Sequence, residues 1–175
     1  MATQKTILIT GASQGIGAGL VNTFLERGYN VVATSRRITG SGRFREAGHL
    51  ALVDGDIGEA ATAAKVAQTA ISRFGSIDAL VNNAGLFLTK PFLEFTPDDM
   101  RKLSSTNIDG FIHLTQLAIK QMLAQKSGGS IVSITTSLAD HPIAGVNASL
   151  SMVTKAASTP SRRALRWSSS RRRYG

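Results

Sequence analysis

A glycine-rich turn near the amino end places the strongest constraint on how this chain can fold. Residues 10–17 read Thr-Gly-Ala-Ser-Gln-Gly-Ile-Gly, with aliphatic residues before them and apolar residues at helical spacing after them. Glycine lets the backbone approach a pyrophosphate closely, and the following helix offers unpaired N–H groups and a positive dipole end. Glycines also mark plain turns, but a position between a strand and a helix favours a dinucleotide site. The predicted contacts are Gly11, Ser13, Gln14, Gly15, Ile16 and Gly17.

Short apolar segments recur along the chain with helical segments between them. The predicted strands are residues 6–10, 30–34, 50–53, 77–81 and 130–134, and helices are predicted at residues 16–26 and 60–74. Aliphatic runs of this length suit parallel strands that are buried on both faces. The alternation predicts an α/β fold of the Rossmann type, a doubly wound parallel sheet of order 3-2-1-4-5 without its final strands. A closed βα barrel would need a longer chain and would not place the glycine turn after the first strand.

The clearest helix start lies at Thr96-Pro97. It has a hydroxyl cap, a proline in the first turn and two carboxylates at the positive end of the helix dipole. Each of these features favours the start of a helix. This helix is predicted to cover residues 97–126, ending before Gly128. Residues 38–48 are polar and rich in glycine, so they predict a surface loop or a short irregular helix.

The net charge of +9 is unevenly distributed along the 175 residues. Residues 156–175 carry six arginines and no acid, so residues 1–155 carry only +3. We therefore expect one cofactor-binding domain, residues 1–157, and a disordered tail rich in arginine and serine, residues 158–175. The composition of the tail suggests the hypothesis of a frameshift after Ala157. A basic arm for nucleic acid is disfavoured, because arginine without lysine or pattern is unusual for one.

Several classes of site and location are excluded by composition. The chain has no cysteine, which removes disulfides, thiolate catalysis and cysteine-ligated metals, and which favours the reducing cytoplasm. The amino end does not read as a signal peptide, and no apolar run could span a membrane. His49, His113 and His141 form no spaced pair, so no metal site is predicted.

Together with a second motif, the glycine pattern resembles the short-chain dehydrogenase/reductase family. Residues 82–85, Asn-Asn-Ala-Gly, follow the fourth predicted strand as in that family, and the resemblance covers residues 5–155. It implies that Asn83, Ala84 and Gly85 line the cofactor site and that Asp56 and Ile57 contact the adenine ring. Without this context, Asp56 would be read as a helix cap and the asparagine pair as a turn.

The residues after the second strand indicate which dinucleotide is bound. A carboxylate there holds the ribose hydroxyls of NAD, whereas a basic residue accepts the 2′-phosphate of NADP. This chain has Arg36 and Arg37 at that point and no acid, which favours NADP(H), with NAD(H) possible. The alternative is that the two arginines form a solvated loop face.

The proton-transfer residues follow the family pattern only in part. Asn107 is a polar residue on an inward helical line, either a satisfied core amide or, by the resemblance, the asparagine that holds a water linked to the catalytic lysine. Lys155 matches that lysine, which also binds the cofactor, but the position four residues earlier is Ser151 where the family has its tyrosine. A serine hydroxyl has a far higher pKa than a phenol and is a poor substitute. The chain's tyrosines, Tyr29 and Tyr174, are distant in sequence.

The family serine that orients the substrate carbonyl lies after the fifth strand. Alignment on the strand selects Thr136, whereas proximity in sequence to the lysine selects Ser137. Either hydroxyl could instead be a simple turn former.

At family level the resemblance implies hydride transfer between NADP(H) and a small carbonyl compound or secondary alcohol. The missing tyrosine supports an alternative, a non-catalytic NAD(P)-binding protein or an inactive truncated remnant. The resemblance also allows a homo-oligomer that pairs through the helix of residues 97–126.

Overall fold

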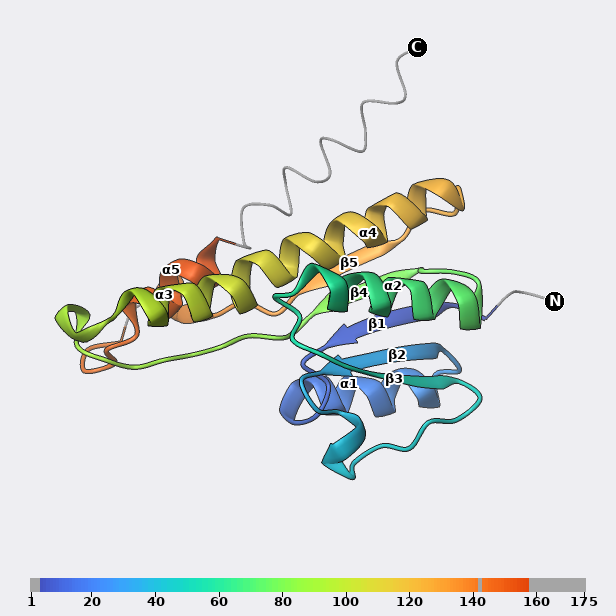
Figure 1. Cartoon of the computed structure of the whole chain (residues 1–175), viewed down its shortest axis with the longest axis horizontal. Coiled ribbons are helices and arrows are strands. Elements are labelled where there is room, and N and C mark those ends of the chain that lie inside the picture. The colour runs from blue at the N-terminus through green and yellow to red at the C-terminus, as the bar shows by residue number, and fades with distance from the viewer. Residues whose placement is uncertain (1–3, 142, 158–175) are drawn as a thin grey trace, which may run out of the picture.

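The computed structural model describes residues 4–141 and 143–157, which form one twisted parallel sheet between two layers of helices (Figure 1). The strands are β1 (Thr6–Thr10), β2 (Asn30–Ser35), β3 (Leu50–Asp54), β4 (Ala79–Asn82) and β5 (Ser130–Ser133). The helices are α1 (Gly15–Glu26), α2 (Ala60–Phe74), α3 (Pro97–Ser104), α4 (Gly110–Ala124) and α5 (Ser149–Ala156). The sheet order is β3-β2-β1-β4-β5, which confirms the predicted order and fold class. The predicted tail, with Tyr174, lies outside the described residues.

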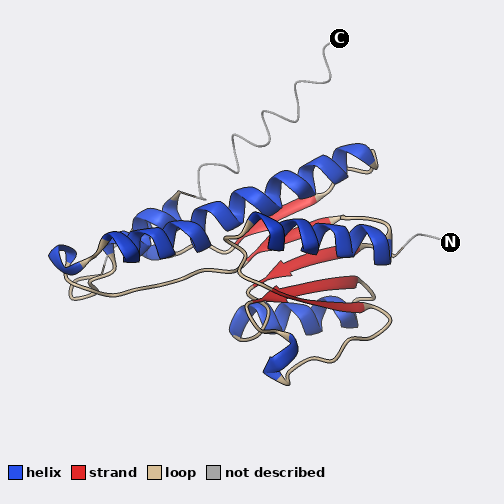
Figure 2. Cartoon of the chain, viewed as in Figure 1, coloured by secondary structure: helices blue, strands red, loops and turns tan. Residues whose placement is uncertain are grey.

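The sheet is buried on both faces because its strands alternate apolar side chains between two cores. Ile7 and Ile9 of β1 pack on the side of α1, while Leu8 packs on the side of α2 and α4. Figure 2 shows α1 on one face of the sheet and α2 and α4 on the other. This layering places the carboxyl ends of all five strands at one edge, where ligands bind in open α/β sheets.

The fourth strand begins two residues later than its apolar run predicts. Ile77 is fully buried, but the Gln125 side chain donates to its carbonyl at 2.8 Å and accepts from its N–H at 3.2 Å. A side-chain amide therefore replaces the sheet as the partner of this backbone unit. Such a contact joins residues 48 positions apart and is invisible to local periodicity.

The helix predicted over residues 97–126 begins as expected but is not a regular α-helix throughout. Thr96 and Asp99 form a capping box, in which each side chain binds the other's backbone N–H. The helix then passes through a π-helical segment, Ser105–Asp109, before α4 continues to Ala124. A π-bulge inside a helix often accompanies a functional site, and this one carries Asn107.

Candidate cofactor cleft and active site

The glycine turn is tied to the end of β4 by the side chains of Thr10 and Asn83. The Thr10 hydroxyl accepts from the backbone N–H groups of Asn83 and Ala84, at 3.0 and 2.9 Å. The Asn83 amide donates in return to the carbonyls of Thr10 and Gly11, at 2.9 and 3.1 Å. The first family-like motif is thus held against the second, and Thr10 is a site residue that the sequence reasoning missed.

Two glycines of the turn leave no room for a side chain. Gly11 has a φ of +65°, and a Cβ there would lie 2.8 Å from the Ala84 Cα. A Cβ on Gly17 would overlap the carbonyl oxygen of Gly11 and approach the Asn83 amide nitrogen to 2.6 Å. The first turn of α1 can therefore lie directly against the loop only while residue 17 is glycine.

A cleft of about 1580 Å³ opens along the carboxyl edge of the sheet. Nearly all the residues predicted to contact the cofactor line it, namely Gly11, Ser13, Gln14, Gly15, Ile16, Arg36, Arg37, Asp56, Ile57, Asn83, Ala84 and Gly85. Gly17 instead packs behind the turn. The structure therefore brings together residues from four separate chain segments at one surface.

The polar groups of this cleft fit a dinucleotide. Besides the glycine cradle, the hydroxyls of Thr34 and Ser35 at the end of β2 are buried and have no hydrogen-bond partner among the described residues. Buried hydroxyls are normally satisfied, so this pair indicates a polar ligand group at that end of the cleft.

The β2 end of the cleft is strongly basic. Arg36 and Arg37 are exposed there, and the following loop adds Arg43, which the sequence reasoning missed. That loop is held to the end of β3, because Asp54 accepts from the backbone N–H of Thr39 at 2.9 Å and from its hydroxyl. These hydrogen bonds from Thr39 lower the pKa of the Asp54 carboxyl.

Asp56 and Ile57, which follow β3, also line the cleft. The Asp56 carboxylate accepts from the Gly58 N–H at 2.9 Å, so it stabilises a turn rather than capping α2, whose N-cap is Glu59. Ile57 is buried in the core, where a Cβ on Gly110 would lie 2.8 Å from its side chain.

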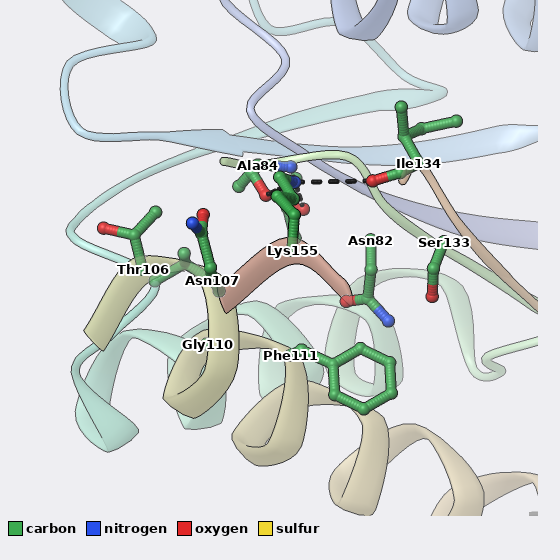
Figure 3. Close-up of a pocket in the computed structure, with 11 residues that line it drawn as sticks. Asn82, Ala84, Thr106, Asn107, Gly110, Phe111, Ser133, Ile134 and Lys155 are labelled. Carbon is green, nitrogen blue, oxygen red and sulfur yellow. Dashed lines mark hydrogen bonds between the residues drawn. The ribbon is translucent and has the colours of Figure 1, made fainter. Parts of the chain in front are cut away.

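A second, small cavity of about 10 Å³ adjoins the cleft and contains the end of Lys155 (Figure 3). It shares Ile57, Ala84 and Thr106 with the cleft, and its size matches one water molecule. The Lys155 ammonium donates to the carbonyls of Ala84 and Ile134, at 3.2 and 3.4 Å. Burial lowers the pKa of Lys155 from its ordinary value of 10.5.

The side chain of Asn107 is fully engaged by the protein. Its amide donates to the Leu86 carbonyl at 3.0 Å and to the Thr154 hydroxyl at 2.9 Å, and its oxygen accepts from the Leu86 N–H at 2.9 Å. Asn107 also lines the Lys155 cavity. Asn107 therefore meets both expectations: its side-chain amide is satisfied within the core, and it lies beside Lys155.

The hydroxyl of Ser151 is completely buried and bound to a single backbone unit. It donates to the Leu88 carbonyl and accepts from the Leu88 N–H, both at 2.8 Å. Ser151 lines neither the cavity nor the cleft among the described residues. Its contacts hold α5 against the segment that follows β4.

Thr136 and Ser137, the two candidates that follow β5, lie near the site but line neither the cleft nor the Lys155 cavity. Thr136 accepts from the Leu138 N–H at 3.2 Å and caps a short 3₁₀ turn, while Ser137 is exposed. The hydroxyl residues that line the Lys155 cavity are Thr10, Thr106 and Ser133. Ser133 ends β5, and sequence reasoning missed it because the strand was expected to continue to Ile134.

The histidines occupy unrelated places. His49 shares a 2.9 Å hydrogen bond with Asn30, and the buried Nδ1 of His113 has no described partner. Within residues 4–141 and 143–157, no group of three side chains of the metal-ligating types gathers. No helix of the same residues is long and apolar enough to cross a membrane.

Asp99, on the α3 side of the cleft, is expected to make stability depend on pH. A hydrogen bond from Lys90, at 2.7 Å, and two from Thr96 lower the pKa of this carboxyl from 3.8 to about 2. Ionised Asp99 therefore stabilises the fold above about pH 4, and this contribution disappears as the pH falls towards 2. Thermal unfolding should show Asp99→Asn less stable than wild type at neutral pH, with the difference closing over that interval.

Asp98→Asn is the matched control, because Asp98 is exposed and its ion pair with Arg101 lies at the surface. An exposed ion pair contributes little. A constant difference between wild type and Asp99→Asn down to about pH 2 would contradict the assignment of this pH dependence to Asp99.

Comparison with known proteins agrees with this geometry. The family model for short chain dehydrogenase matches residues 5–159. A diacetyl reductase, (S)-acetoin forming, from Staphylococcus epidermidis is 32% identical over 142 residues, 78% of this chain and 55% of that protein. An NADP-dependent (R)-specific alcohol dehydrogenase from Lentilactobacillus kefiri is 32% identical over 136 residues, 75% of this chain and 54% of that protein. The chain spans about half the length of these curated relatives.

Solved structures show the same architecture. A 3-ketoacyl-(acyl-carrier-protein) reductase from Brucella melitensis, complexed with NADH, superposes with a TM-score of 0.85 at 27% identity, covering 92% of this chain and 68% of that one. A short-chain dehydrogenase/reductase from the same organism gives a TM-score of 0.84 at 28% identity, covering 95% of this chain and 70% of that one. Sequence, fold and site geometry agree, and the chain belongs to the short chain dehydrogenase family of oxidoreductases.

Proposed function

We propose that this chain binds NADP(H) in the cleft and transfers a hydride between it and a carbonyl compound or secondary alcohol. The observation that carries the proposal is the glycine cradle at the carboxyl edge of the sheet, held by Thr10 and Asn83 beside the Lys155 cavity. The cofactor supplies or accepts the hydride when it is bound. The residues of this chain bind it, orient the substrate and move the proton.

The pyrophosphate would lie at the amino end of α1. The amino end of a helix offers unpaired backbone N–H groups, and the helix dipole favours negative charge there. Asn83, Ala84 and Gly85 would continue the contact towards the reacting end, with Asp56 and Ile57 beside the adenine. All five line the cleft.

The 2′-phosphate of NADP would be held by Arg36 and Arg37, with Arg43 close by. A cleft end with three arginines and unpartnered hydroxyls of Thr34 and Ser35 suits a dianion better than a neutral ribose. The alcohol dehydrogenase relative is named as NADP-dependent, whereas the reductase structure holds NADH. We propose NADP(H) because the β2 end of the cleft is basic.

Proton movement is assigned to the Lys155 cavity. Its volume suits one water molecule, and Asn107 lies on its wall, so a relay from Lys155 through such a water fits the space. Thr136 or Ser137 is proposed to orient the substrate oxygen, since both follow β5 on the side where Lys155 binds Ile134.

A second function, NADP(H) binding without turnover, is favoured by one observation. The hydroxyl of Ser151, which replaces the family tyrosine, is buried and engaged by Leu88. Fluorescence titration with NADPH tests binding, and oxidation of NADPH with a panel of carbonyl compounds tests turnover. NADPH bound without oxidation would support this second function, and absence of binding would reject both.

Reversing the charge at Arg36 and Arg37 is expected to separate the two dinucleotides. Each charge-assisted hydrogen bond to a phosphate contributes about 1.5–3 kcal/mol, so the double Arg→Glu variant should bind NADPH about 100-fold more weakly or worse. Its affinity for NADH should change far less, because NADH lacks the 2′-phosphate. Fluorescence titration with each dinucleotide measures both values.

Arg27→Glu provides the control for net charge, since Arg27 is exposed at the far end of α1. It should leave the ratio of the two affinities unchanged. Equal losses for NADPH and NADH in the double variant would count against the proposed phosphate contact.

Self-association through the helix of residues 97–126 stays a prediction. In the described chain, α4 exposes Ile112 and Leu123 at 40% and 47% of their surface. Sedimentation of wild type and a double variant with both residues changed to glutamine would test it, with dissociation expected in the variant.

A further inference from the structure

We propose that Lys102 determines substrate specificity, and that its ammonium binds the carboxylate of an oxo acid in the cleft. This inference rests on the proposed function and deepens it, because it names the class of carbonyl compound that the cleft takes. Lys102 lies on α3, in a part of the cleft wall that neither cofactor binding nor proton movement uses. Arg101 beside it adds positive charge to the same wall.

The cleft is basic on two walls that come from opposite sides of β1. Arg36, Arg37 and Arg43 follow β2, whereas Arg101 and Lys102 lie on α3, which follows β4. The sheet order places β2 and β4 on either side of β1. Figure 1 shows α3 extending beyond the strand ends, on the other side of them from the loop after β2. The arginines proposed to hold the 2′-phosphate are therefore a separate group from the cations of α3.

The two cations of α3 differ in their partners. The Arg101 guanidinium pairs with Asp98 at the surface. Within the part of the chain that the structure describes, Lys102 forms no ion pair, and its side chain makes no hydrogen bond. Asp99 lies three residues earlier on α3, but its carboxylate is paired with Lys90 at 2.7 Å. The wall therefore carries one ammonium that is available to a ligand.

Lys102 is close enough to the reacting end of the cleft to hold one end of a small substrate. Thr106 lines both the cleft and the Lys155 cavity. Lys102 lies four residues before Thr106, which is about 6 Å along a helix axis. The flexible four-carbon stem of a lysine extends its reach further. A carboxylate on Lys102 would thus leave only a short carbon chain between it and the reacting carbonyl.

An apolar strip runs beside Lys102. Residues 86–90 follow the cofactor-binding motif of β4, and both leucines of this segment line the cleft. Hydrogen bonds tie the segment to the helix on either side of Lys102, those of Leu86 with Asn107 and of Lys90 with the first turn of α3. The carbon chain of an oxo acid would contact these leucines while its carboxylate meets the ammonium.

The charge of this wall favours a carboxylate over a phosphate. One unpaired ammonium matches a monoanion, and a charge-assisted hydrogen bond from lysine to carboxylate is among the stronger kinds. A phosphate monoester is close to a dianion at neutral pH and suits a cluster of cations such as the one after β2. The substrate class that fits is therefore a carbonyl compound with one carboxylate.

The first test measures contact with Lys102 and needs no turnover. Wild-type protein saturated with NADP⁺ is trace-labelled with acetic anhydride, and peptide mass spectrometry reports how fast each lysine reacts. We expect pyruvate or levulinate to slow the labelling of Lys102, and their neutral methyl esters to leave it unchanged. Lys120 is the reference in the same sample, because it is exposed on α4 and does not line the cleft.

The labelling experiment has two outcomes that overturn the proposal. In one, neither oxo acid slows the reaction of Lys102 relative to Lys120. In the other, NADP⁺ alone protects Lys102 fully, which would assign the ammonium to the cofactor.

The second test compares each oxo acid with its methyl ester in NADPH oxidation. Lys102→Gln should lose about 10-fold in kcat/KM for the oxo acids, as expected for one hydrogen bond to a charged group. The loss should lie in KM, because the contact is made equally before and during hydride transfer. The methyl esters and the Kd of NADPH should be unaffected. Lys120→Gln is the matched control and should behave as wild type.

The outcomes separate this inference from the proposed function. Equal losses for oxo acids and esters, or a preference of the wild-type protein for dihydroxyacetone phosphate over levulinate, would reject the carboxylate contact and leave hydride transfer intact. A wild-type protein that binds NADPH but reduces no carbonyl would instead reject hydride transfer. The labelling experiment would still decide whether Lys102 binds a carboxylate.

Discussion

Changing Gly17 to alanine should weaken NADPH binding about 100-fold and also destabilise the fold. The added Cβ would overlap the Gly11 carbonyl and press on the Asn83 amide, which itself holds the turn. These neighbours are backbone and a bound side chain, so the glycine turn must move. Loss of two hydrogen bonds to the pyrophosphate, at about 1.5 kcal/mol each, corresponds to that drop in affinity.

The effect on stability has two opposing parts. Alanine is a better helix former than glycine by about 1 kcal/mol, whereas overpacking against a rigid neighbour costs about 1–3 kcal/mol. Urea unfolding should therefore show net destabilisation. Gly19→Ala is the matched control, because Gly19 is exposed in the same helix and its Cβ would meet nothing within 4 Å. It should gain stability and bind NADPH normally. Equal stability and equal NADPH affinity of Gly17→Ala and Gly19→Ala would show that the close approach at Gly17 is unimportant.

Changing Ser151 to tyrosine, which would recreate the family motif, should unfold part of the protein rather than create activity. The site has no exposed surface, so a phenol ring would overpack it at a cost of about 1–3 kcal/mol. It would also break both bonds to Leu88, at about 1 kcal/mol each. A total of about 3–5 kcal/mol is a large share of the stability of an ordinary domain.

Ser151→Ala separates the two costs, since it removes the hydrogen bonds without adding volume. Its loss should be about 1–2 kcal/mol by urea unfolding, well below that of Ser151→Tyr. Limited proteolysis should then cut residues 86–90 of the tyrosine variant fastest, because that segment loses its anchor. A tyrosine variant as stable as wild type, with faster carbonyl reduction, would show that the serine position can accept the family residue.

Sequence alone determined the scaffold and the cofactor end of the site. The five strands, their order and the glycine turn were predicted because hydrophobic periodicity and turn chemistry are local properties of a chain. Arg36 and Arg37 could be placed in the cleft for the same reason, since the carboxyl end of a parallel strand always faces the same edge.

The reacting end of the site was decided by tertiary structure. Thr10 binds Asn83 across 73 residues, Ser151 binds Leu88 across 63, and Asn107 binds Thr154 across 47. Neither the saturation of the serine hydroxyl nor the close approach of the Lys155 ammonium to Gly85 follows from a spacing rule. Each depends on which backbone groups meet when α5 folds onto the segment after β4. Hydrogen-bond partners are chosen by proximity in space, so an alignment could place Ser151 at the tyrosine position, and only the fold could show that its hydroxyl is already engaged.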